Sequence, residues 1–175
     1  LLAAGILVPI YLQSLMGYSA TVSGLVLLPG AIIMGAMGPI AGRLFDKYGP
    51  RVLALVGMGV LTLTTFCFCF LGPNMGLITL TVLYTVRLFS LSLVNMPITT
   101  WGMNALSNEL VNHGTSVNNT FRQVAGSLGT AIIVSASTIA TNASAPAMGE
   151  QAASFFGIDV AFAVAGVLCL IGFVM

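Results

Sequence analysis

Long apolar runs separated by short polar breaks are the dominant pattern along this chain. Breaks at glycine, proline, asparagine and charged residues leave six candidate spans, each near the roughly 20 residues that cross a bilayer. Their approximate bounds are 1–15, 21–41, 52–71, 75–96, 115–140 and 158–175. Because the runs are continuously apolar and do not alternate with polar residues, helices are favoured over a membrane β-barrel. The pattern predicts an all-α integral membrane fold, a bundle of six transmembrane helices.

The two ends of the chain lie inside apolar runs. Leu1 is already within the first run and Met175 is still within the last. We therefore expect a single transmembrane bundle over residues 1–175, truncated at both ends and with an amino-terminal half missing. The small residues of 141–157 predict a loop before the last span.

The composition supports a membrane environment. Hydrophobic residues make up 58% of the chain and charged residues only 5%, whereas soluble domains carry roughly 25% charged residues. The five basic and four acidic side chains are too few to give 175 residues a wet surface, so the lipid bilayer is the expected partner. No basic run points to nucleic acid, and no Walker loop points to ATP as the energy source.

Cofactor and metal chemistry are not expected. The three cysteines lie in apolar runs without the further ligands of a zinc site, which predicts free thiols; they are Cys67, Cys69 and Cys169. The spans contain no paired acids and no nucleophile beside a histidine, so we expect no catalytic residues and no enzyme.

The basic residues predict the orientation of the bundle. Three of the five, Arg43, Lys47 and Arg51, share the linker 42–51, and loops rich in Lys and Arg stay in the cytoplasm. Counting helices from this linker also makes 99–114 cytoplasmic. The linkers expected on the other side contain no Lys or Arg, so the assignment is consistent.

The linker 42–51 is the most specific segment of the chain. Asp46 is placed to accept hydrogen bonds from a helix amino terminus or to pair with a basic residue such as Arg43. Gly49 permits a turn, and Pro50 suits the first position of the following helix. The glycines that precede the linker, at 35, 38 and 42, form a small face on which a neighbouring helix could approach closely. The alternative is an ordinary basic loop with a glycine turn.

This segment resembles the loop motif of the major facilitator superfamily, Gly-x-Leu-Ala-Asp-Arg-x-Gly-Arg followed by Lys or Arg. The candidate gating and structural residues of the motif are Gly42, Arg43, Asp46, Lys47, Gly49 and Arg51. The match also includes Leu44, whereas Phe45 and Pro50 depart from the motif, which would weaken the latch that the loop forms in the family.

Two further stretches resemble the fourteen-helix drug:proton antiporters of the EmrB/QacA type. One runs from Tyr11 through Gly17-Tyr18-Ser19-Ala20 to Pro29, and the other from Gly114-Thr115-Ser116 through Arg122-Gln123 to Ala131. The resemblance implies helices nine to fourteen of such a protein, its carboxy-terminal half. It also implies a multi-pass protein of a bacterial cytoplasmic membrane that exchanges protons for small hydrophobic or cationic compounds by alternating access between two bundles.

Four polar residues are candidates for a substrate pathway. Arg87 lies in the middle of the fourth span, where a charge costs about 2.5 to 3.5 kcal/mol, so it should face the bundle interior; a purely structural hydrogen-bonding role is the alternative. Asn119 and Arg122 lie on one face of the fifth span, where they could form a gate or simply reach the headgroups. Gln13 is the fourth candidate, with an interfacial anchor as its alternative.

The acidic residues are predicted to lie outside the membrane, in linkers or at a helix end. They are Asp46, Glu109, Glu150 and Asp159. Since proton coupling needs an embedded group that can titrate, we expect the coupling acids in the missing half. The competing functions are a metabolite or solute carrier of the same superfamily and a non-transporting assembly subunit.

Overall fold

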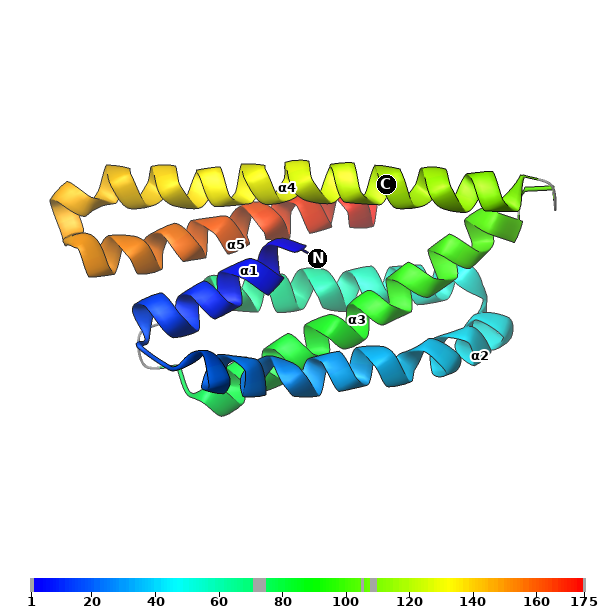
Figure 1. Cartoon of the computed structure of the whole chain (residues 1–175), viewed down its shortest axis with the longest axis horizontal. Helices are drawn as coiled ribbons and strands as arrows, with labels where there is room; N and C mark the ends of the chain where they lie inside the picture. Colours follow the sequence, from blue (N-terminus) through cyan, green and yellow to red (C-terminus); the bar gives the residue numbers. More distant parts are fainter. Residues whose placement is uncertain (1, 71–74, 105, 108–109, 175) are drawn as a thin grey trace.

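The computed structural model describes residues 2–70, 75–104, 106–107 and 110–174, and these are almost entirely helical (Figure 1). The elements in chain order are α1 (Leu2–Ile10), a π-helical turn (Tyr11–Leu15), α2 (Ala20–Cys67), a 3₁₀ turn (Phe68–Phe70), α3 (Leu77–Asn104), α4 (Val111–Met148) and α5 (Glu150–Val174). Four of these, α2 to α5, are long and apolar enough to cross a membrane. The prediction of an all-helical membrane protein is therefore confirmed. The number of six spans stays a prediction.

Helix α2 consists of two helical segments that meet at Gly49. Gly49 has φ 76° and ψ 164°, a backbone conformation that glycine adopts readily and other residues avoid. Residues 42–48 are helical, so most of the predicted linker 42–51 continues the first segment instead of forming a loop. Pro50 follows directly, and its fixed φ and missing N–H suit the start of the second segment.

Two other predicted connections are also largely helical. Helix α3 runs to Asn104 and α4 begins at Val111, so only part of 99–114 connects them. The predicted loop 141–157 is wrong: α4 continues to Met148 and α5 begins at Glu150. The hydroxyl of Thr141 donates to the carbonyl of Ser137 at 2.9 Å, so a small polar residue here satisfies its side chain within the helix.

Gly149 forms the whole connection between α4 and α5. Its φ of 83° and ψ of 157° end the helical ladder, and its N–H still donates to the carbonyl of Ala145. A 38-residue helix such as α4 is about 57 Å long, well beyond the roughly 30 Å of a hydrocarbon core. The helix therefore extends past the apolar layer. The predicted end of the third span falls on residues 71–74, which lie outside the described residues.

The helices form two closely packed groups with α1 beside both. The two segments of α2 pack mainly against α3, and α4 packs mainly against α5 as an antiparallel pair. Figure 1 shows α1 between this pair and α2, and α5 also contacts α2. Among the four long helices α4 is the least buried, so most of its surface is available to lipid, to cavities or to other parts of a larger protein.

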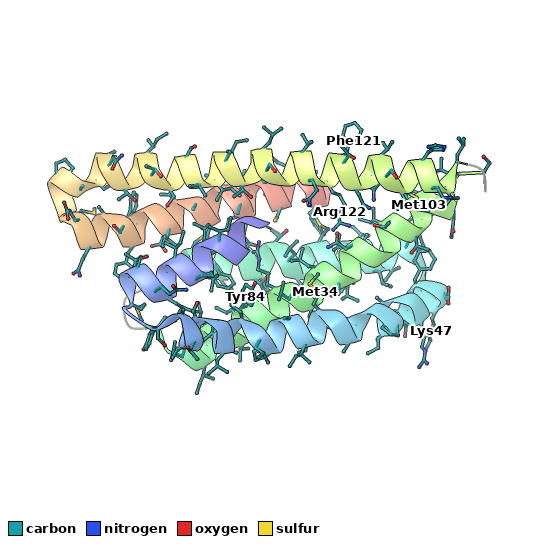
Figure 2. The ribbon with its side chains drawn as sticks, in the orientation of Figure 1. Met34, Lys47, Tyr84, Met103, Phe121 and Arg122 are labelled. Atoms are coloured by element: carbon teal, nitrogen blue, oxygen red, sulfur yellow. The ribbon has the colours of Figure 1, made fainter. Side chains whose placement is uncertain are left out.

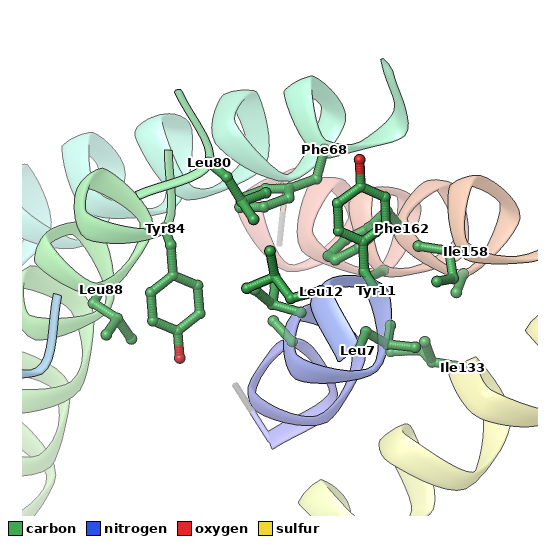
Figure 3. Packing of buried hydrophobic residues seen from close by; sticks show 14 of the residues in the cluster. Leu7, Tyr11, Leu12, Phe68, Leu80, Tyr84, Leu88, Ile133, Ile158 and Phe162 are labelled. Atoms are coloured by element: carbon green, nitrogen blue, oxygen red, sulfur yellow. The ribbon is translucent and has the colours of Figure 1, made fainter. Parts of the chain in front are cut away.

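The core joins the π-helical turn to the second segment of α2, to α3 and to α5. Tyr11, Leu12, Phe68 and Phe162 are almost completely buried there. The rings of Phe68 and Phe162 stack with centroids 4.9 Å apart, and Figure 3 shows them close to Leu12 and Tyr11. Since lipid offers no hydrophobic driving force, dispersion in such contacts holds the bundle together.

Glycines bring α2 and α3 together, but Gly35 and Gly42 of the predicted small face are not among them. A Cβ at Gly35 or Gly42 would meet nothing within 4 Å. By contrast, a Cβ at Gly30 would lie 2.8 Å from Leu88 Cδ1, and a Cβ at Gly57 would lie 2.6 Å from Val94 Cγ2. Gly30 and Gly57 are therefore the close-approach positions, one on each segment of α2.

Replacing Gly57 with Ala should destabilise the bundle. The added methyl would also lie 3.1 Å from the carbonyl oxygen of Ser90, which cannot rotate away, and overpacking of this kind costs about 1–3 kcal/mol. The measurement is the midpoint of thermal unfolding of the full-length protein in detergent. Gly35→Ala is the matched control on the same helix and should leave the midpoint unchanged or slightly higher. Equal midpoints for the two variants would contradict the packing argument.

Candidate transport cavities

The larger cavity lies between α1, the first segment of α2, α3 and α4. Its volume is about 870 Å³, within the range of roughly 300–1,000 Å³ that is typical of small-molecule sites. Figure 2 labels Met34 of α2 and Tyr84 of α3, two of its lining residues, where these helices lie together. The lining residues are Gly5, Ile6, Ala31, Met34, Tyr84, Leu88, Ser127, Thr130, Ala131 and Val134.

The lining of the larger cavity is apolar with a few hydroxyl groups, and no charged residue of the described part of the chain belongs to it. The hydroxyl of Ser127 donates to the carbonyl of Gln123, and that of Thr130 to the carbonyl of Gly126, each at 2.8 Å. These hydroxyls donate their protons within their own helix, so toward a ligand they can act only as hydrogen-bond acceptors. Such a lining suits apolar molecules that carry at most a few hydrogen-bond donors.

A second cavity of about 480 Å³ lies between the second segment of α2, α3, α4 and α5. Its polar lining residues are Arg87, Asn95, Arg122, Gln123 and Thr130. Most of the remaining lining is aliphatic, with Cys169 on α5. Thr130 lines both cavities. The two cavities are thus neighbours that differ in charge.

Arg87 is deeply buried at the second cavity. Only 4% of its surface is exposed, and its Nη1 donates to the hydroxyl oxygen of Thr65 at 2.5 Å. The hydroxyl of Thr65 donates in turn to the carbonyl of Leu61 at 2.6 Å. This bond holds the Thr65 oxygen in place as the acceptor for Arg87. The Nε of Arg87 is buried without a partner. The guanidinium therefore lies in the bundle interior, as the cost of an exposed charge in lipid requires, and its function stays a prediction.

The other three pathway candidates do not all meet Arg87. Figure 2 shows Arg122 on the side of α4 that faces α3, with Phe121 on the opposite side. Arg122 and Arg87 thus line the same cavity. Asn119 and Gln13 are exposed and line neither of the two cavities. The polar face that the sequence indicated on this helix therefore reaches the cavity from Arg122 inward, through Gly126 and Gly129.

The loop-motif side chains lie at the surface near the Gly49 kink. Arg43, Asp46, Lys47 and Arg51 are all exposed, and Lys47 Nζ lies 5.2 Å from the centroid of the Tyr48 ring. Within the described residues Asp46 makes neither an ion pair nor a hydrogen bond. A latch through Asp46 would therefore need a partner outside the described part of this chain, and its gating function stays a prediction.

Asp159 does not lie at a helix end, and that prediction is wrong. Helix α5 begins at Glu150, so Asp159 is well inside a helix long enough to span the membrane. It is half-buried, and its Oδ1 is buried without a hydrogen-bond partner. Its carboxyl lies within electrostatic range of Tyr11 and of Cys69.

Of the other acids, Glu150 begins α5 and so lies at a helix end as predicted, and Asp46 lies in the helical stretch before the Gly49 kink. Asp46 and Glu150 are exposed, and Glu109 lies outside the described residues. Asp159 was misplaced because reading 141–157 as a loop started the last span eight residues too late.

The described residues contain no group of three or more His, Cys, Asp or Glu side chains that could bind a metal ion.

Comparison with known proteins points to one family. The sequence model of the Major Facilitator Superfamily matches residues 1–130. An uncharacterized MFS-type transporter of Bacillus subtilis (strain 168), YcnB, is 44% identical over 97% of this chain and 36% of its own length. The lincomycin resistance protein LmrB of the same organism is 37% identical over 99% of this chain and 38% of its own length.

A more distant relative is the multidrug export protein EmrB of Haemophilus influenzae, which is 28% identical over 75% of this chain and 26% of its own length. The chain thus spans roughly a quarter to two fifths of the length of these relatives. No solved structure matches the chain.

Proposed function

Because this chain belongs to the major facilitator superfamily, a family of membrane transporters and not of enzymes, we propose that it forms the carboxy-terminal bundle of a proton-coupled multidrug exporter. In this proposal the bundle has six spans: α1 with its π-helical turn, the two segments of α2, and α3, α4 and α5. The names of the relatives LmrB and EmrB support drug export. Alternating access then moves this bundle against the rest of the protein.

The observation that carries the proposal is the larger cavity. Its volume of about 870 Å³ suits drug-sized molecules, and its apolar lining provides contacts that do not depend on one particular arrangement of hydrogen bonds. Met34 adds a flexible side chain that can adjust to different shapes. Small residues at Ala31 and Ala131 leave the space open. These features favour small hydrophobic substrates of varied structure.

Cationic substrates need an acid that this cavity does not contain. None of its lining residues is acidic, so in the proposal the counter-charge for a drug cation comes from the rest of the full-length protein. Proton coupling is distributed in the same way: Asp159 contributes an embedded carboxyl from this bundle, and further coupling acids lie in the rest of the chain.

A dye-retention assay tests the proposal. Cells that express the full-length protein should retain less of a hydrophobic fluorescent dye than cells with an empty vector, and a protonophore should raise retention to the vector level. Proton-driven efflux predicts both changes. If neither expression nor the protonophore alters retention of a panel of hydrophobic dyes, multidrug export is wrong and a solute carrier or an assembly subunit becomes the better explanation.

A further inference from the structure

We propose that the smaller cavity, lined by Arg87 and Arg122 between α2, α3, α4 and α5, binds a small amphipathic organic anion through its carboxylate. Nothing in the proposed efflux of hydrophobic compounds requires this second site. The ligand would place its anionic end at the two arginines and its apolar body against the aliphatic wall. The inference does not depend on the direction of transport or on proton coupling.

Arg87 carries a buried charge that no described side chain balances. A guanidinium has five N–H donors, and one of them is used by the hydroxyl of Thr65. Its Nε is buried without a partner, and the described residues offer Arg87 no ion pair. A buried cation without a counter-ion is strongly unfavourable in a bilayer. An anion in the adjoining cavity would remove this imbalance.

The remaining polar lining residues add a second cation and neutral groups, but no anion. Arg122 enters from α4, and Asn95 and Gln123 contribute amide groups. Among the residues that the structure describes, no acidic side chain lines the cavity. Asp46 and Glu150 lie at the surface, and Asp159 acts on Tyr11 and Cys69 instead. Two guanidinium groups on one cavity form a lining suited to bidentate binding of a carboxylate.

The rest of the cavity wall suits an apolar ligand body. Apart from these polar groups, the wall is mostly aliphatic, with Leu61, Leu91, Val94, Ile133 and Leu168. A volume of about 480 Å³ exceeds what an inorganic anion would fill. The lining therefore favours an anion with an apolar body, such as an aromatic carboxylate, over phosphate or chloride.

Cys169 provides a direct measurement of the electrostatic potential in the cavity. Cys169 is one of the lining residues of the cavity and lies within electrostatic range of Arg87, whereas Cys67 and Cys69 are not among the lining residues. In a full-length variant in which Cys169 is the only cysteine, an anionic methanethiosulfonate reagent should react faster than a cationic one, after division by their rates with a free thiol. This ratio cancels any change in the reactivity of the thiol itself.

The arginine variants test the assignment. Arg87→Gln and Arg122→Gln should each lower the anionic preference. Arg122 is exposed on the least buried long helix, so its variant keeps the experiment informative if Arg87→Gln fails to fold. Lys47→Gln, which removes a cation remote from the cavity, is the matched control and should leave the ratio unchanged. A preference for the cationic reagent, no reaction at Cys169 unless the protein is denatured, or a ratio unaffected by both arginine variants would overturn the proposal.

Ligand protection tests occupancy. Benzoate should slow the modification of Cys169, and benzamide, a neutral molecule of the same shape, should not; the protection should be lost in Arg122→Gln. Equal protection by both compounds, or protection by neither, would contradict an anion site. The reaction is repeated in vesicles of phosphatidylcholine with and without phosphatidylglycerol. Slow modification with phosphatidylglycerol alone would assign the site to a lipid headgroup and overturn the small-molecule ligand.

Discussion

Replacing Asp159 with Asn in the full-length protein should abolish efflux driven by a proton gradient, while exchange of substrate across the membrane without a gradient continues. The carboxyl lies inside α5 with a buried Oδ1 that has no hydrogen-bond partner. Asn has nearly the same shape but cannot gain or lose a proton. The variant therefore separates coupling from substrate binding, provided that the protein is the proton-driven exporter proposed above.

Glu150→Gln is the matched control for Asp159→Asn. Glu150 begins the same helix but is exposed, so its neutralisation should leave gradient-driven efflux unchanged. Both variants are reconstituted in vesicles and compared in gradient-driven and exchange assays. Within the described residues, the titratable groups in electrostatic range of Asp159 are Tyr11 and Cys69, and Cys69→Ser should retain coupling. Full gradient-driven efflux by Asp159→Asn would exclude this carboxyl from coupling.

Replacing Ala131 with Trp should raise dye retention in cells to the level of an empty vector. Ala131 faces the larger cavity from α4, and an indole there would occupy the space that the proposed substrates need. Because α4 is the least buried long helix, the side chain can be accommodated without forcing the core apart. The amount of protein in the membrane should therefore stay close to that of the parent, which is measured alongside dye retention.

Ala143→Trp is the matched control for this change. Ala143 lies on the same helix, is exposed, and lines neither cavity, so the same bulk there should leave retention low. If Ala131→Trp is inserted normally and still exports every dye of the panel, the larger cavity is not the substrate pathway. Lost insertion in both variants would instead show that α4 does not tolerate the bulk of Trp.

Apolar run length predicted the kind of fold but not where the helices end. The long runs required helices because a bilayer cannot satisfy backbone groups in any other open structure. Hydropathy, however, reports which residues prefer lipid and not at which residue a helix ends. Thr141, Asn142 and Ser144 are polar, yet they continue α4, since a helix that leaves the apolar layer remains hydrogen-bonded. Gly149, with its positive φ, ends the helix instead.

The burial of Arg87 was predictable from its charge, whereas the position of the larger cavity was not predictable; a pathway function of the four polar candidates stays a prediction. Arg87 had to face the interior because an embedded cation is costly in lipid, and it does. Arg122 was indicated by its shared face with Gly126 and Gly129, and all three line the smaller cavity. The larger cavity is formed by small residues such as Gly5 from separate helices, and no local pattern identifies them.

Thr130 lines both the apolar cavity and the arginine-lined cavity, so a single side chain forms part of the wall between two compartments. A molecule that displaces Thr130 from one side changes the volume available on the other. Binding free energies in two such compartments are linked by one coupling free energy, which acts equally in both directions. An anion that weakens the affinity for a hydrophobic compound by some factor is then itself bound more weakly, by that same factor, when the hydrophobic compound is present.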